Sequence, residues 1–157
     1  MRRRAEVPRG QGRGAAEARC IERLRRICLA LPEALEKRSH GEPTWFAGAG
    51  KAFATLDDHH HRSEHLSVWM PLPLGAQEAL LARDPARYFR PPYVGGRGWV
   101  ALVLDGNPDW AEVATLLREA FLLVAGRRLA ARLLGAPHRG RGPDAYRGGS
   151  AAAGRYR

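Results

Sequence analysis

A glycine-rich turn between two short apolar runs is the feature that most limits how this chain can fold. The runs cover residues 44–47 and 51–56, and both carry aromatic or β-branched side chains. Gly48-Ala49-Gly50 joins them and supplies the positive φ angles that a tight hairpin needs. This segment therefore predicts a β-hairpin with Lys51 at its tip.

The residues that follow extend this hairpin into a larger sheet. Leu66, Val68 and Met70 alternate with other residues, which is the period of a β-strand. Residues 99–104 are apolar on both faces, so we expect a central or covered strand there. The short connections favour antiparallel pairing, and the hairpin becomes a meander.

Three further segments have the composition or periodicity of helices. Residues 15–31 and 110–125 place apolar side chains at spacings of three and four, and residues 76–83 are strong helix formers. Leucines at 129, 133 and 134 allow a helical continuation to about residue 134. The predicted order is α-β-β-β-α-β-α, an α+β domain with an antiparallel sheet packed by the N-terminal and C-terminal helices on one face.

Positive charge is concentrated at the two ends of the chain. The 157 residues carry a net charge of +10, but residues 15–125 hold 13 basic and 14 acidic side chains. Residues 1–14 and 126–157 are rich in arginine, glycine and alanine, and they can bury too little apolar surface to fold alone. We therefore expect a disordered basic arm over 1–14, a domain over 15–125 and an Arg/Gly-rich tail over 126–157.

The two cysteines indicate a reducing environment. Cys20 and Cys28 lie eight positions apart on one predicted helix, about 12 Å along its axis, which is too far for a disulfide. No apolar run is long enough to cross a bilayer, and no apolar signal-peptide region follows the first arginines. The expected location is cytoplasmic, with no membrane partner.

Motifs of common enzymes do not occur in the sequence. No serine has the G-x-S-x-G context, Gly50-Lys51 lacks the upstream glycine of a phosphate-binding P-loop, and the glycines at 95–98 precede a strand instead of following one. We therefore expect a non-catalytic protein without a cofactor.

A polar loop offers potential metal ligands. His59, His61 and His65 lie close in sequence to Asp57, Asp58 and Glu64, but their spacing matches no recognised metal motif. A solvated loop between two strands is the simpler interpretation, so no metal site is predicted, although binding by residues 59–65 stays open.

Basic and aromatic residues alternate between positions 83 and 99. Such a pattern can neutralise phosphates and stack on bases, but the aromatics can equally be core residues with arginines at the rim. Arg62 lies in the polar loop, and glycines 95, 96 and 98 either admit a phosphate or form turns. The candidate DNA-contacting residues are Lys51, Arg62, Arg90 and Arg97.

Several segments, in order, resemble the MmcQ/YjbR family of small bacterial proteins. They are Cys28-Leu29-Ala30-Leu31-Pro32-Glu33, residues 39–46, Gly50-Lys51-Ala52-Phe53-Ala54, Pro92-Tyr93-Val94-Gly95 with Gly98-Trp99-Val100, and residues 110–124. The resemblance implies a fold like that of the frataxin relative CyaY, a double-wing DNA-binding motif, and DNA as the ligand. Lys51 matches the family's hairpin lysine, whereas Gly98 stands where many members carry histidine.

We therefore expect a non-catalytic DNA-binding protein that contacts phosphates through a hairpin wing and basic loops, with the arginine-rich ends adding non-specific affinity. The alternative is a module that binds a protein or a small ligand on its sheet, and whose basic ends alone attract nucleic acid. The near-neutral charge of residues 15–125 motivates this alternative.

Overall fold

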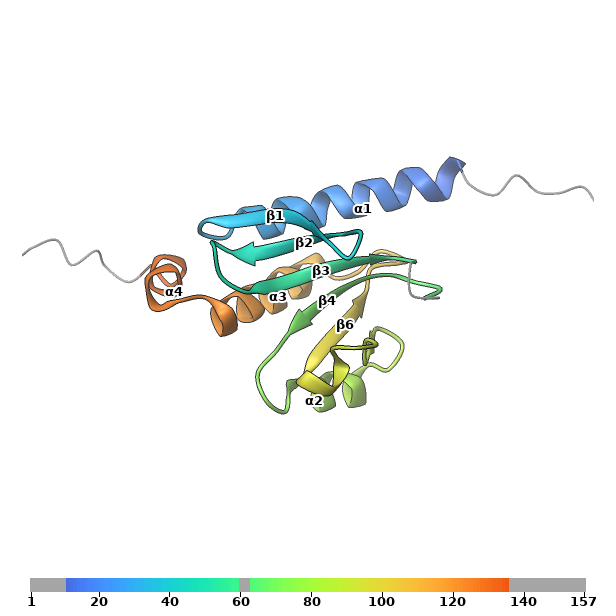
Figure 1. The fold of residues 1–157 in the computed structure, drawn as a ribbon. Coiled ribbons are helices and arrows are strands. Elements are labelled where there is room, and N and C mark those ends of the chain that lie inside the picture. The colour runs from blue at the N-terminus through green and yellow to red at the C-terminus, as the bar shows by residue number, and fades with distance from the viewer. Residues whose placement is uncertain (1–10, 60–62, 136–157) are drawn as a thin grey trace, which may run out of the picture.

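The computed structural model describes residues 11–59 and 63–135 (Figure 1). Six strands form one antiparallel sheet in the order β1-β2-β3-β4-β6-β5. The elements, in chain order, are α1 (Gln11–Leu29), β1 (Ala34–Ser39), β2 (Glu42–Ala47), β3 (Ala52–Asp58), β4 (Leu66–Pro71), α2 (Ala76–Arg83), β5 (Tyr88–Phe89), the 3-10 turn η1 (Gly95–Arg97), β6 (Trp99–Val103), α3 (Trp110–Val124) and α4 (Arg127–Leu133).

One face of the sheet, which we call the helix face, is covered by α1 and α3 (Figure 1). The side chains of Trp45, Phe53, Val68 and Phe121 are fully buried between these layers. The rings of Phe53 and Phe121 meet edge to face with centroids 5.3 Å apart, so they join β3 directly to α3.

The predicted α+β class and the helices at both ends of the domain are confirmed. The structure contains the predicted hairpin as β2 and β3, and β6 lies between β4 and β5, as expected for a covered strand. Strands β1 and β5 are missing from the predicted order. β1 is an edge strand with charged residues at positions 36–38, which have low strand propensity, and β5 has only two residues.

Helices extend past both predicted ends of the domain. α1 begins at Gln11, inside the segment expected to be an arm, and α4 follows a break at Gly126. Leu129 of α4 is buried in the core, and Arg128 forms an ion pair with Glu33 at 2.7 Å. Part of the predicted tail therefore packs on the domain, while residues 1–10 and 136–157 lie outside the described residues.

Both cysteines are free thiols, as their spacing predicts. Burial raises the pKa of Cys28 far above its ordinary value and also raises the pKa of Cys20. A raised pKa favours the neutral thiol over the reactive thiolate in both side chains. Within the described residues, no helix is long and apolar enough to cross a membrane.

Candidate nucleic-acid interface

The second face of the sheet carries polar side chains beside aromatic ones, where the helix face carries only apolar side chains in its buried core. Cross-strand pairing aligns Thr44 with Thr55, Thr55 with Trp69, and Trp69 with Ala101. Side chains alternate along a strand, so this row lies opposite Trp45 of the helix-packed core, and the register shift between Trp45 and Phe46 lets Phe53 pack on the helix face as well. We call it the loop face, because the segment between α2 and β6 contributes residues to its cavities.

A cavity of about 620 Å³ lies on the loop face. Its walls come from segments that are far apart in the sequence: the turn between β1 and β2, the middle strands, and the loop before β6. The lining residues are Ser39, His40, Glu42, Thr44, Ala52, Thr55, Leu56, Trp69, Tyr93, Val94, Arg97 and Trp99. Most of them fall within segments that carried the family resemblance in the sequence.

Two threonines form a polar floor in this cavity. The hydroxyl oxygens of Thr44 and Thr55 lie 2.7 Å apart and share a hydrogen bond across β2 and β3. The carbonyl oxygens of Glu42 and Pro43 lie 3.4 Å from the hydroxyls of Thr44 and Thr55, respectively, so the hydroxyl that does not donate to the other threonine can donate to a carbonyl. The floor therefore offers a ligand the remaining lone pairs of these oxygens as acceptors.

Gln77 of α2 holds the loop wall in place. Its buried side-chain amide donates to the carbonyl oxygens of Gly95, at 2.8 Å, and Trp99, at 2.6 Å. A Cβ atom on Gly95 would meet the Cγ of Arg90 at 2.4 Å, so only glycine lets the Arg90 stem lie this close. Gly95 is thus a packing position and is not available to cradle a phosphate.

One side chain at the cavity is held in an unusual backbone conformation. His40, at φ 52°, belongs to the two-residue turn between β1 and β2, where positive φ is the ordinary geometry, but Tyr93 has φ 65° in the left-handed region that bulky residues rarely adopt. The Tyr93 side chain is nevertheless 85% exposed, so burial of its ring does not compensate for the strain. Such strain concentrates at functional sites.

Three of the four predicted DNA-contacting residues lie at or beside this cavity. Arg97 lines it, Lys51 immediately precedes the lining residue Ala52, and Arg90 packs on the loop that forms one wall. All three side chains are exposed, and none forms a hydrogen bond or ion pair with another residue that the structure describes. Arg62 lies outside the described residues.

Other members of the basic and aromatic segment have structural roles. Tyr88 is 1% exposed and donates to Glu112 at 2.6 Å, and burial raises its pKa far above the ordinary value. Arg83 pairs with the same carboxylate. Arg87 donates to the carbonyl of Asp105 at 2.7 Å. For these residues, the interpretation as core and rim is the right one.

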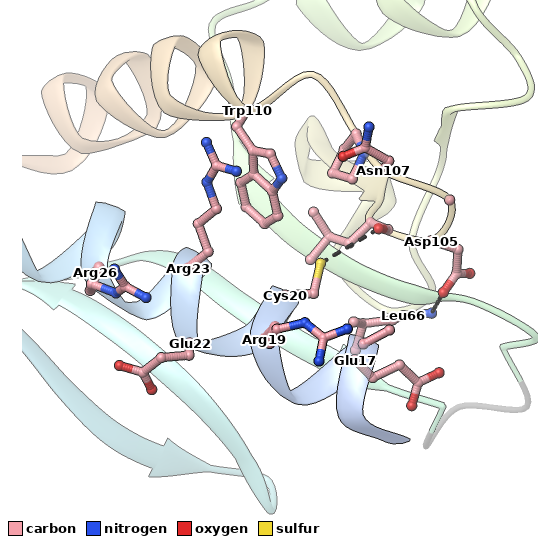
Figure 2. Close-up of a pocket in the computed structure, with 14 residues that line it drawn as sticks. Glu17, Arg19, Cys20, Glu22, Arg23, Arg26, Leu66, Asp105, Asn107 and Trp110 are labelled. Atoms are coloured by element: carbon pink, nitrogen blue, oxygen red, sulfur yellow. Dashed lines mark hydrogen bonds between the residues drawn. The ribbon is translucent and has the colours of Figure 1, made fainter. Parts of the chain in front are cut away.

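Sequence reasoning missed a second hollow, of about 680 Å³, between α1 and the loop that joins β6 to α3 (Figure 2). The Arg23 guanidinium lies over the Trp110 ring, 4.9 Å from its centroid. Arg19 and Arg26 lie on the same helix, four positions before and three positions after Arg23. This spacing predicts that the three arginines share one face of the helix, and it was visible in the sequence. Three acidic residues, Glu17, Glu22 and Asp105, also line the hollow and offset these charges.

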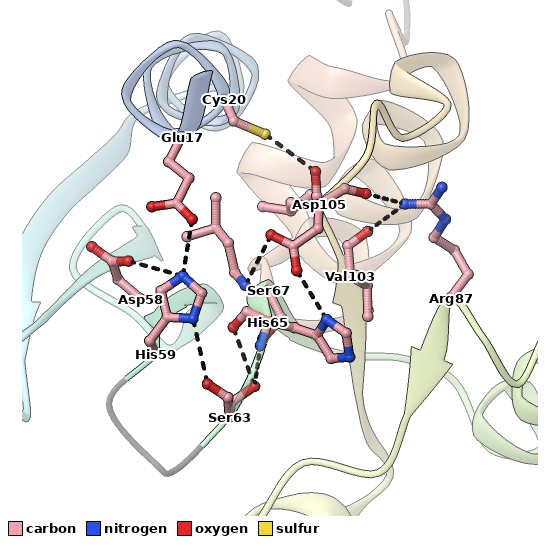
Figure 3. Close-up of polar contacts among 12 residues, drawn as sticks. Glu17, Cys20, Asp58, His59, Ser63, His65, Ser67, Arg87, Val103 and Asp105 are labelled. Carbon is pink, nitrogen blue, oxygen red and sulfur yellow. Dashed lines mark hydrogen bonds and ion pairs between the residues drawn. The ribbon is translucent and has the colours of Figure 1, made fainter. Parts of the chain in front are cut away.

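The histidine-rich loop distributes its side chains among different partners (Figure 3). His59 bonds through Nε2 to Glu17 at 3.1 Å, whereas His65 bonds through Nδ1 to Asp105 at 2.9 Å. Partial burial disfavours the charged form of His59, but the hydrogen bond and charge of Glu17 prevail and raise its pKa. Glu17, Asp58 and His59 bring their polar atoms within 4.8 Å of one another, while His61 lies outside the described residues.

The comparisons with known proteins give one family match and one solved structure of similar fold. The YjbR family model matches residues 29–123, more than half of the chain. Among solved structures, Deinococcus radiodurans protein DR2400, which has a DUF419 domain, matches with a TM-score of 0.55 and 20% identity over 66% of this chain and 76% of that chain. No curated protein matches. With most of the domain inside the matched range, we conclude that the chain belongs to the YjbR family.

Proposed function

We propose that this YjbR-family protein binds DNA on the loop face of its sheet, mainly through contacts from Lys51, Arg90 and Arg97 to backbone phosphates. The observation that carries the proposal is that Arg97 lines the cavity, that Arg90 packs against the loop of its wall and that Lys51 precedes the lining residue Ala52. All three side chains are exposed and have no partner among the described residues. A cation without a carboxylate partner can bind a phosphate without first giving up an ion pair.

Paired arginines elsewhere in the molecule show the contrast. Arg128 and Arg132 both bind the carboxylate of Glu33, and Arg25 binds Glu36 at 2.8 Å. These arginines hold elements together, and their charge is already compensated. Binding by the domain therefore depends on where its free cations lie and not on its total charge, which is close to neutral over residues 15–125.

The salt dependence of affinity tests the proposal. Each phosphate contact releases counterions, so the slope of log affinity against log salt changes by about 0.9 per contact on duplex DNA. We expect Arg97→Ala to weaken binding of labelled DNA to the full chain and to reduce that slope by about one unit. A slope unchanged from the wild-type value would exclude Arg97 as a phosphate contact.

The cavity also favours a second candidate, a module that binds a small ligand on its sheet. Its polar floor and aromatic walls suit an organic molecule, and about 620 Å³ lies within the usual range for ligand sites. The affinity for a neutral ligand would change little with salt concentration, whereas the affinity for DNA would fall steeply as salt rises.

A further inference from the structure

We infer that the loop-face cavity receives one unpaired nucleobase of the bound DNA strand, so that the protein prefers single-stranded to fully paired DNA. This inference rests on the DNA binding proposed above and specifies which part of the DNA occupies the cavity. It follows from the chemistry of three parts of the cavity: its aromatic walls, its polar floor and the cation at its rim.

The aromatic walls suit a flat ring. Tyr93 and Trp99 come from the loop and the start of β6, and Trp69 comes from the sheet. Trp69 is only 5% exposed, whereas Tyr93 is 85% exposed, so the aromatic surface extends from the sheet out to solvent. Every nucleobase has a π face, and stacking on aromatic side chains is the common way in which proteins hold unpaired bases.

The polar floor suits the edge of a base. The hydroxyl protons of Thr44 and Thr55 have acceptors within the floor, but each oxygen keeps a lone pair that can accept from an N–H of a base. His40, held at φ 52°, adds an exposed ring nitrogen from the turn between β1 and β2. A base offers both donors and acceptors along its edge, whereas an aliphatic ligand would leave these groups unsatisfied.

The rim places a cation where the backbone of the strand would pass. Arg97 lines the cavity and is exposed, and no described residue pairs with its guanidinium. A nucleotide carries its negative charge next to the base, so one cavity can hold the ring while Arg97 meets the phosphate. A base stacked inside a duplex cannot enter a protein cavity unless it is first unpaired, which costs free energy.

The test compares two labelled single strands of equal length, one intact and one built from abasic nucleotides that keep every phosphate. We expect the full chain to bind the intact strand more tightly by about 5- to 150-fold, the range for one base stacked on an aromatic side chain. Tyr93→Gly should remove this preference. Glycine is favoured at the positive φ of this position, and an unfolding transition as cooperative as that of the wild type would show that the variant is folded.

Control variants separate the ring from the backbone. Tyr93→Phe keeps the ring and should keep the preference for the intact strand. Leu74→Ala removes another exposed large side chain that does not line the cavity and should bind like wild type. Loss of the preference in Leu74→Ala as well would overturn the assignment to Tyr93.

Three outcomes would contradict the inference in distinguishable ways. Equal affinity for intact and abasic strands, with a steep salt dependence, would overturn the base pocket but keep DNA binding. No binding to either strand or to duplex would overturn the proposed function as well. Saturable quenching of tryptophan fluorescence by deoxynucleoside monophosphates, without a preference for the intact strand, would assign the cavity to free nucleotides and not to DNA.

Discussion

The two faces of the sheet differ in what their side chains contribute. On the helix face, Phe53 and Phe121 are fully buried and contact each other. On the loop face, Tyr93 is 85% exposed at φ 65°, and Arg97 lines a cavity of about 620 Å³. The helix face thus gains stability from close packing, while the loop face keeps backbone strain and exposed cations that pair with no described residue. Mutations should therefore separate folding from binding.

The largest effect is expected on the helix face. Phe121→Ala removes a fully buried ring and should lower the free energy of unfolding by about 3–5 kcal/mol, measured by denaturant unfolding. DNA affinity per folded molecule should change little. Leu123→Ala, on the same helix but 49% exposed, should cost far less. An affinity loss in folded Phe121→Ala would show that the two faces are not separable.

A smaller effect is expected for the residue that attaches the loop to the sheet. Gln77→Ala leaves the carbonyl oxygens of Gly95 and Trp99 without their side-chain donor and should cost about 1–3 kcal/mol. Amide hydrogen exchange should accelerate in residues 90–98 more than in α3. Glu78→Ala, the exposed neighbour on α2, is the control, and similar exchange in both variants would refute the role of Gln77.

Relief of backbone strain at Tyr93 should raise the free energy of unfolding, whereas the two variants above lower it. Tyr93→Gly removes about 1–3 kcal/mol of strain and gives back about 0.4–1 kcal/mol through the greater freedom of the unfolded chain. We expect a net stabilisation of about 1 kcal/mol, seen as a higher melting temperature. Tyr93→Ala keeps the positive φ, so it should be less stable than Tyr93→Gly. If Tyr93→Ala were the more stable variant, the positive φ would not be the source of the destabilisation at this position.

The smallest expected effect is a pH dependence of stability from His59, which lies at the opposite end of the sheet from the Lys51 turn. The pKa of His59 is raised in the folded state, so its bond to Glu17 stabilises most fully below the unfolded pKa, about 6.5, and is lost as pH rises through the folded pKa. The melting temperatures of wild type and Glu17→Gln should therefore differ most near pH 6 and converge as pH rises above the folded-state pKa of His59. Glu78→Gln is the control, and a difference that grows with pH would contradict this sign.

Periodicity and turn chemistry were sufficient to predict most of the helix face. The stripes of α1 and α3 and the Gly48-Ala49-Gly50 hairpin are local patterns, and local patterns are visible in a sequence. β1 was missed because its register partners, and not its own residues, make it a strand: Glu36 pairs with Trp45 and Lys37 with Thr44.

The loop face was harder to predict, because its site depends on register and on contacts between distant segments. The charge and loop position of Lys51, Arg90 and Arg97 could be read directly. In contrast, the floor formed by Thr44 and Thr55 exists only through pairing of β2 with β3. Nothing in the sequence around Gln77 indicates that it holds a loop about 20 residues away.

The most direct test of binding by the loop face compares two triple variants of the full chain that lose equal charge. One carries Lys51→Ala, Arg90→Ala and Arg97→Ala. The other carries Arg19→Ala, Arg26→Ala and Arg127→Ala, which are also exposed and have no hydrogen-bond or ion-pair partner among the described residues.

Affinity for labelled single-stranded DNA at one fixed salt concentration is the measurement. We predict that the loop-face triple weakens binding at least about tenfold more than the matched triple, since only the former removes positioned phosphate contacts. Equal losses in the two triples would contradict the account, because binding would then follow net charge and not the loop face.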